Sequence, residues 1–123
     1  MDEAMPAGYR AGVYFISRQP MPTAICTSSD EIALGVMQAM YEKRLSVPHD
    51  ISITGENNTL IGSSIRPALT TIADPAEGIG ELAVELLLSR IEGRYTGPAR
   101  QQMVNARQLL IRQTTAPPQT VSP

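Results

Sequence analysis

The clearest secondary-structure pattern of this chain lies in the stretch PTAICTSSDEIALGVMQAMYEKRLSVPHDISITGENN, from Pro22 to Asn58. It opens with a short apolar run, passes through a polar turn with an acid into an amphipathic segment, and closes with a second apolar run. This order predicts a strand, a helix and a second strand, the unit that builds parallel sheets. Ligands of such sheets bind beyond the carboxyl ends of the strands, and Asp30 follows one of these ends.

The two strands of this unit are predicted at Thr23 to Thr27 and at Ile51 to Thr54. Apolar and β-branched residues throughout the first run predict a strand that is buried on both faces. Cys26, the single cysteine of the chain, is therefore expected to be a buried strand residue and not a reactive thiol. His49 precedes the second strand and is expected to be a solvated loop residue.

The helix between these strands carries two adjoining apolar stripes. Ser28 and Glu31 have the spacing of a capping box, which predicts the start of the helix, and we expect the helix to run to about Arg44. One stripe suffices to cover a sheet, so the second predicts either a partner surface or a broad arc that faces the core. The first stripe is Ala33, Val36 and Met40, and the second is Leu34, Met37 and Tyr41.

The chain beyond this unit predicts a second well-signalled helix. Asp74 has the position of an N-cap, Pro75 that of the first helical residue, and Gly93 that of the stop. The helix carries one apolar stripe, formed by Ile79, Leu82, Ala83, Leu86 and Leu87.

The other segments give weaker patterns. We expect a short helix over 7–17, an irregular loop over 57–67, a short strand over 69–72 and a last strand within 103–112. The segment 114–123 is rich in proline and has no apolar periodicity, so it is expected to be disordered.

Composition limits the classes of function. Apolar residues make up 42% and charged residues 18% of the 123 residues, which is typical of a globular protein. The net charge of -2 gives no excess of positive charge that would attract nucleic acid. A lone cysteine excludes an intrachain disulfide and a thiolate metal site. No apolar run has the length of a membrane helix or the pattern of a signal peptide, so we expect a cytoplasmic location.

Three segments resemble, in order and spacing, the carboxyl-terminal part of the lactose-repressor and galactose-repressor (LacI/GalR) family of bacterial transcription regulators. They are SSDEIALGVMQAM, RLSVPHDISITG and RPALTTIADPAEGIGELAVELLLSRIEG, and the resemblance covers about Gly8 to Ala116. It implies an α/β, periplasmic-binding-protein-like fold of type I, present in part: a Rossmann-like parallel-sheet subdomain plus a helix that crosses to the other subdomain. Residues 1–116 would then be a partial effector-binding and dimerisation domain, residues 117–123 a tail, and the DNA-binding headpiece would be absent.

The same resemblance suggests site residues. Asp30 occupies the position of an acid that contacts the effector in the family. The alternative is that Asp30 only helps to cap the helix. Asn57 lies after the glycine of the second strand, where the family usually has an aromatic residue and two acids. Asn57 is therefore an effector candidate, but formation of a turn is the stronger expectation for it. The family dimerises partly through the helix that corresponds to Glu31 to Tyr41. The resulting interface candidates are Leu34, Met37, Gln38 and Tyr41.

The expected function is that of an effector-sensing and dimerisation fragment of a LacI/GalR-type regulator. Its partners would be a sugar or nucleoside-like molecule, a second copy of the chain, and DNA only through the absent headpiece, with no membrane partner. The alternative is a fragment of a periplasmic sugar-binding protein of an uptake system. We expect no enzyme and no cofactor, because no catalytic constellation, metal-ligand cluster or phosphate loop stands out.

Overall fold

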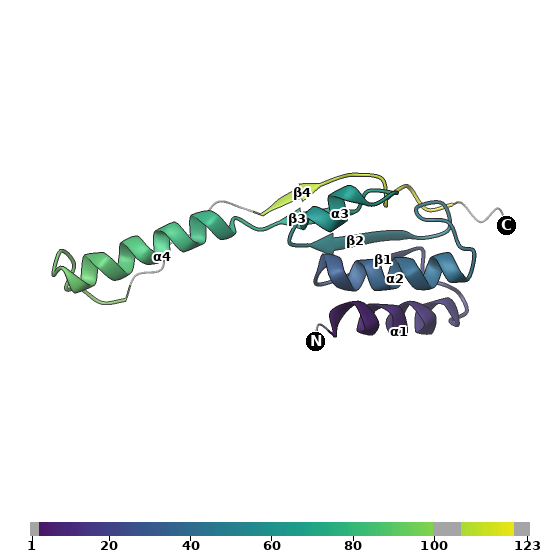
Figure 1. Cartoon of the computed structure of the whole chain (residues 1–123), viewed down its shortest axis with the longest axis horizontal. Coiled ribbons are helices and arrows are strands. Elements are labelled where there is room, and N and C mark those ends of the chain that lie inside the picture. The colour runs from purple at the N-terminus through teal and green to yellow at the C-terminus, as the bar shows by residue number, and fades with distance from the viewer. Residues whose placement is uncertain (1–2, 100–106, 120–123) are drawn as a thin grey trace. The chain divides into compact units, whose positions relative to one another are not determined.

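In the computed structural model, which describes residues 3–99 and 107–119, the chain divides into two units, Met1–Ala73 with Gln108–Pro123, and Asp74–Arg107. The first unit is an open sheet covered by helices (Figure 1). Its elements are α1 (Ala4–Ile16), β1 (Ala24–Cys26), α2 (Asp30–Glu42), β2 (Ser52–Glu56), α3 (Leu60–Ser64), β3 (Thr70–Ala73) and β4 (Gln108–Leu110). The second unit holds α4 (Ala76–Ile91).

The sheet has the order β1-β2-β3-β4. Strands β1, β2 and β3 are parallel, and β4 returns antiparallel to β3. The predicted strand, helix and strand unit is therefore confirmed, and its carboxyl ends lie along one edge of the sheet together with the end of β3. The predicted last strand is present as β4, while its expected start at Met103 lies outside the described residues.

The core forms where α2 packs on one face of the sheet. It consists of Ile25, Ala33, Val36, Met40, Ile51, Ile53 and Leu69, all buried. The stripe of Ala33, Val36 and Met40 thus faces the core and covers the sheet, as the sequence predicted. Strand β1 is buried on one face only, because Ala24 and Cys26 are exposed while Ile25 is buried, and it forms an edge of the sheet. The prediction of a fully buried strand with an inert, buried Cys26 is wrong on burial.

Helix α1 packs against α2, which lies between it and the sheet (Figure 1). The two backbones approach closely because glycines meet at the contact: a Cβ atom on Gly8 would lie 2.1 Å from the Ile32 carbonyl oxygen. On α2, a Cβ atom on Gly35 would lie 2.0 Å from the Met5 carbonyl oxygen. The sequence predicted a short helix over 7–17, and α1 begins one turn earlier.

The ends of α2 differ from the predicted ones. The N-cap is Ser29, whose extended backbone lets its Oγ accept from the Ile32 backbone N–H at 3.2 Å, whereas Ser28 is exposed. The predicted capping box of Ser28 and Glu31 is therefore wrong: the cap lies one residue later, at Ser29, and Ile32 has no side-chain acceptor that could complete a box. The helix ends at Glu42 because Arg44 adopts a left-handed conformation with φ of 59°, which an α-helix does not continue.

Two segments are ordered although the sequence predicted an irregular loop for one and disorder for the other. The predicted loop 57–67 contains α3, because the Thr59 hydroxyl caps the helix by accepting from the Gly62 backbone N–H at 3.3 Å. The segment after β4 runs beside β2 and β3, with Thr114 fully buried. Its hydroxyl donates to the Ile53 carbonyl at 2.7 Å and accepts from the Thr70 backbone N–H at 2.8 Å. Disorder from Thr114 onward is thus a wrong prediction there, while residues 120–123 lie outside the described part.

The second unit is built on α4. The helix is confirmed, but Asp74 does not cap it: Pro75 is the N-cap residue without a side-chain cap, and the Asp74 carboxylate pairs with Arg107 at 2.7 Å. None of the residues of α4 is buried, and Ile79 and Leu87 of the predicted stripe are 49% and 58% exposed. Among the helices that the structure describes, none is long and apolar enough to cross a membrane.

Candidate functional site

Asp30 lies in the first turn of α2, at the carboxyl edge of the sheet, and its side chain is fully buried. Its carboxylate is held by two threonines from distant segments. The backbone N–H and the hydroxyl of Thr59 donate to Oδ2 at 2.6 and 2.9 Å, and the Thr71 hydroxyl donates to Oδ1 at 2.6 Å. Three donors compensate the loss of water around the buried carboxyl group. Asp30 therefore joins α2, α3 and β3.

Strand β2 makes room for this carboxylate through Gly55. A Cβ atom at this position would lie 2.2 Å from Asp30 Oδ1, so no side chain fits between the strand and the acid. Gly62 of α3 approaches the other side, where a Cβ atom would lie 3.1 Å from Oδ2. The acid is thus enclosed by backbone and by threonine donors, which explains its complete burial.

The residues after β2 form the exposed part of the same edge. Asn57 and Asn58 both have left-handed backbones, with φ of 98° and 51°, which asparagine tolerates better than most residues. The Asn57 backbone N–H donates to the Ile72 carbonyl at 2.9 Å, while its side chain lies on the exposed surface. Asn58 Oδ1 accepts from Arg112 at 2.5 Å. Sequence reasoning missed Arg112, whose only signal was a cation after an apolar strand.

A second feature is the α2 groove, an apolar hollow of about 260 Å³ between α2 and the segment that follows α3. It brings together all three residues of the second apolar stripe. Tyr41 is the most exposed of them at 82%, while Leu34 and Met37 are half-buried. The groove is lined by Leu34, Met37, Tyr41, Leu45, Val47, Ile65, Arg66 and Pro67. The last five were not predicted: Leu45 and Val47 follow α2 beyond its periodic stripe, and residues 65–67 come from a segment that is distant in the sequence.

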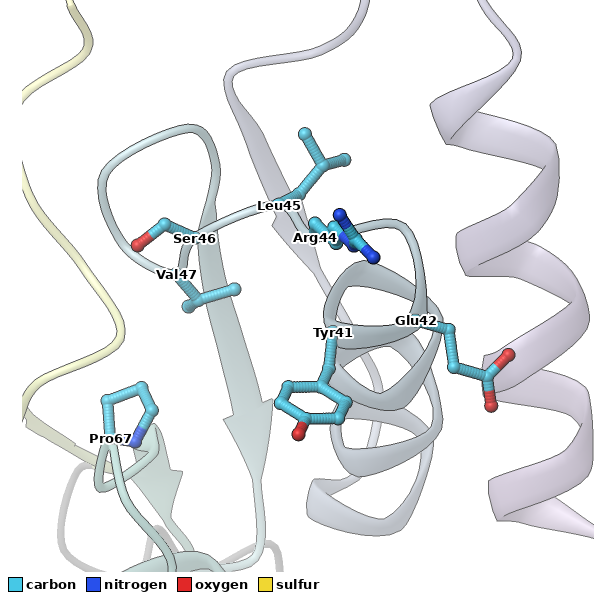
Figure 2. Close-up of a pocket in the computed structure, with 7 residues that line it drawn as sticks. All are labelled: Tyr41, Glu42, Arg44, Leu45, Ser46, Val47 and Pro67. Carbon is cyan, nitrogen blue, oxygen red and sulfur yellow. The ribbon is translucent and has the colours of Figure 1, made fainter.

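The groove continues at the carboxyl end of α2 into a more open hollow of about 620 Å³ (Figure 2). Figure 2 shows the Tyr41 ring and the Val47 side chain pointing into the space before Pro67, whereas Glu42 points to the opposite side of α2. Glu42 accepts a hydrogen bond from the Tyr9 hydroxyl of α1 at 2.6 Å, and this bond raises the pKa of Tyr9. Tyr41 and Glu42 therefore serve different surfaces.

Gln38, the fourth interface candidate, does not line the α2 groove. It is exposed and donates to Glu42 Oε1 at 3.3 Å. His49 is exposed, as predicted, and its Nδ1 lies 3.1 Å from Asp50 Oδ1. In the described part of the chain, no group of three histidine, cysteine or acidic residues could hold a metal ion.

Comparison with known proteins identifies the family. The model of the periplasmic binding protein-like domain matches residues 2–115. The ribose operon repressor of Escherichia coli is 39% identical over 95 residues, which are 77% of this chain and 28% of the repressor. The chain thus spans less than a third of this curated relative.

Two solved structures share the fold over 94% of the chain. One is a LacI family transcriptional regulator from Enterococcus faecium with bound ribose, 28% identical with a TM-score of 0.82, of which the chain covers 42%. The other is a LacI family regulator from an Arthrobacter species in complex with lactose, 27% identical with a TM-score of 0.81, of which the chain covers 43%. The chain belongs to the periplasmic-binding-protein-like domain family, in the form that LacI/GalR-type regulators carry in their sensing domain.

Proposed function

We propose that this chain is the effector-sensing and self-association part of a bacterial transcription regulator that acts in the cytoplasm. The observation that carries the proposal is the similarity to the ribose operon repressor over 77% of the chain. Because the chain spans 28% of that repressor, DNA binding is proposed for a headpiece of the whole regulator and not for this chain. No enzymatic activity is proposed.

The effector in this proposal is a sugar or a similar molecule with neighbouring hydroxyl groups. Asp30 and Asn57 are the proposed contacts, since both lie at the carboxyl edge where ligands of parallel sheets bind. An ionised carboxylate accepts strongly from paired hydroxyls, and a site built around it rejects analogues that lack them. Because Asp30 is fully buried, sugar hydroxyls reach it by taking the place of the Thr59 donors.

The second partner in this proposal is another copy of the chain, which docks on the α2 groove. In a twofold interface the same patch meets itself, so Tyr41 of one copy fills the hollow beside Tyr41 of the other. An aromatic residue that is 82% exposed next to an apolar hollow has the character of an interface anchor. Leu34 and Met37 form the centre of the proposed interface, and Gln38 lies at its polar rim.

The proposed mechanism couples the two surfaces through a shift of populations. The effector binds one orientation of the two subdomains better than the other, and thereby changes the relative placement of the headpieces in the dimer. The differential affinity of the effector for the two orientations sets the size of the response.

A chimera tests the sensing function. In the chimera, the aligned residues of this chain replace the 95-residue segment that they match in the ribose operon repressor. A reporter gene under the control of the ribose operator measures repression without sugar, with ribose, and with each of a panel of other sugars. We expect repression that one sugar relieves, and loss of relief without loss of repression in Asp30→Asn. Asp50→Asn is the matched control, since Asp50 precedes β2 at the opposite end of the strand and should leave the response intact. A chimera that represses but responds to none of the sugars would overturn the proposal.

A further inference from the structure

Helix α3 connects the two surfaces described above, because its N-cap residue, Thr59, is bound to Asp30 and the residues after its last turn line the α2 groove. We infer that Thr59 is a positioning residue that couples the Asp30 carboxylate to the groove wall formed by Ile65, Arg66 and Pro67. The inference deepens the proposed function, since it names the element by which occupancy at the carboxyl edge alters the self-association surface.

The anchor at the start of α3 consists of a single residue. Thr59 uses both its backbone N–H and its hydroxyl to donate to Asp30 Oδ2, at 2.6 and 2.9 Å. The same hydroxyl accepts from the Gly62 backbone N–H at 3.3 Å, so it is the N-cap of α3 at the same time. Thr59 thus ties the start of α3 to the Asp30 carboxylate through two hydrogen bonds.

The apolar side chains of α3 contribute little to holding the helix. Leu60 and Ile61 are 82% and 58% exposed, and Gly62 is the one buried residue among the five of α3. Gly62 itself lies against the carboxylate, where an added Cβ atom would be 3.1 Å from Oδ2. The position of α3 therefore depends on Asp30 more than on burial of apolar surface.

The far end of α3 is tied rigidly to its start. The Ile65 backbone N–H donates to the Ile61 carbonyl at 3.2 Å, and the Leu69 backbone N–H donates to the Gly62 carbonyl at 2.9 Å. Arg66 closes the turn by donating from Nη1 to the Ile65 carbonyl at 2.7 Å. Ile65 packs against the core and also lines the α2 groove, so a shift of α3 moves the wall of the groove.

The burial of Asp30 makes the two occupants of its Oδ2 atom exclusive. A donor from a ligand reaches this oxygen only when the Thr59 hydroxyl leaves it, since the side chain is 0% exposed in the presence of Thr59. Departure of Thr59 also removes the cap of α3. The groove wall is consequently held in its present place by Thr59 and released by a competing donor.

Hydroxyl removal at Thr59 tests this coupling in the full chain without any ligand. Thr59→Val keeps the shape and removes the hydroxyl, Thr59→Ser keeps the hydroxyl, and amide hydrogen exchange is measured at Ile65. We expect exchange at Ile65 to accelerate at least tenfold in Thr59→Val, which corresponds to about 1.4 kcal/mol, and to stay near the original rate in Thr59→Ser. Thr27→Val is the control, because Thr27 also donates through its hydroxyl at the carboxyl edge, to the Ser29 and Thr54 carbonyls, without touching α3.

The outcomes separate this inference from the proposed function. Equal exchange at Ile65 in Thr59→Val and in Thr27→Val would overturn the coupling, and so would acceleration of the same size in Thr59→Ser. The exchange measurement requires neither an effector nor a second copy, so it stands even if the chain does not associate. In an associating chain, we expect the dissociation constant of the dimer to rise at least threefold in Thr59→Val and not in Thr59→Ser. An unchanged constant alongside faster exchange would overturn the link to the groove.

Discussion

A methyl group has no room at Gly35, where α2 meets the backbone of α1. The Cβ atom of Gly35→Ala would lie 2.0 Å from the Met5 carbonyl oxygen and 2.7 Å from the Tyr9 backbone nitrogen. Ordinary contact begins at 3.4 Å, so α1 must withdraw by about 1.4 Å along this direction. Both clashing atoms belong to the backbone of a helix, and no rotation of a side chain relieves them.

The expected cost follows from two opposing terms. Overpacking of a tight contact costs about 1–3 kcal/mol, and contact with two backbone atoms places this case near the upper end. Replacement of glycine by alanine inside a helix returns about 1 kcal/mol of helix propensity. We therefore expect Gly35→Ala to lower the free energy of unfolding by about 2 kcal/mol.

Urea unfolding followed by far-UV circular dichroism measures this change, with the slope m as a check that the unfolding transition is the same. Gly80→Ala on α4 is the matched control, because a Cβ atom there meets nothing within 4 Å. The control should gain helicity and lose no stability. Unfolding of Gly35→Ala at the same or a higher urea concentration than the original chain would contradict the close approach of α1 and α2.

Two further predictions concern the carboxyl-terminal strap, which is the segment around Thr114 that runs beside β2 and β3, and the pH dependence of stability. Thr114→Val should lower the free energy of unfolding by about 2–3 kcal/mol in urea titrations, since it leaves the buried Thr70 N–H without its acceptor, and an unchanged midpoint would contradict the strap. The Ser46 backbone N–H holds the pKa of Asp50 below its usual value of 3.8, with a smaller contribution from His49. This stabilisation is present above the usual pKa and is lost as the pH falls through the lowered one, so Asp50→Asn should reduce the loss of thermal stability on acidification below pH 3.8. An equally steep loss in Asp50→Asn would contradict the assignment.

Apolar periodicity and helix-end residues in the sequence predicted the strand, helix and strand unit and helix α4. The periodicity of α2 and its flanking apolar runs predicted the strand, helix and strand unit, and Pro75 with Gly93 bracketed α4. The capping residues were less well predicted. Ser28 and Ser29 are equally suited by chemistry, and only the extended backbone of Ser29 decides between them.

Long-range contacts explain what the sequence did not predict. Thr114 lies in a proline-rich segment with the composition of a disordered tail, yet its hydroxyl bonds to Ile53, which is 61 residues away. Cys26 has the composition of a buried strand residue, and its exposure follows from the place of β1 at the edge of the sheet. Neither property is encoded within a few residues of the position.

The candidate site also has a part that local spacing predicted and a part that depends on contacts between distant segments. Leu34, Met37 and Tyr41 share one stripe at helical spacing and so could be predicted together. The opposite wall of the groove comes from residues 65–67, whose proximity depends on the path of α3. Asp30 was predicted to lie at the carboxyl edge, and it does. Its enclosure by Thr59 and Thr71, 29 and 41 residues further along the chain, was outside the reach of pattern reasoning.

Self-association through the α2 groove is tested most directly by sedimentation equilibrium of three chains: the original, Tyr41→Ala and Leu60→Ala. Tyr41 and Leu60 are both 82% exposed, but only Tyr41 lines the groove, so the pair separates an interface contact from general surface hydrophobicity. We expect the original chain and Leu60→Ala to form dimers with the same dissociation constant. Tyr41→Ala should weaken the dimer by about 2 kcal/mol, roughly 30-fold in the constant. A monomeric original chain, or equal constants for the two variants, would contradict association through this groove.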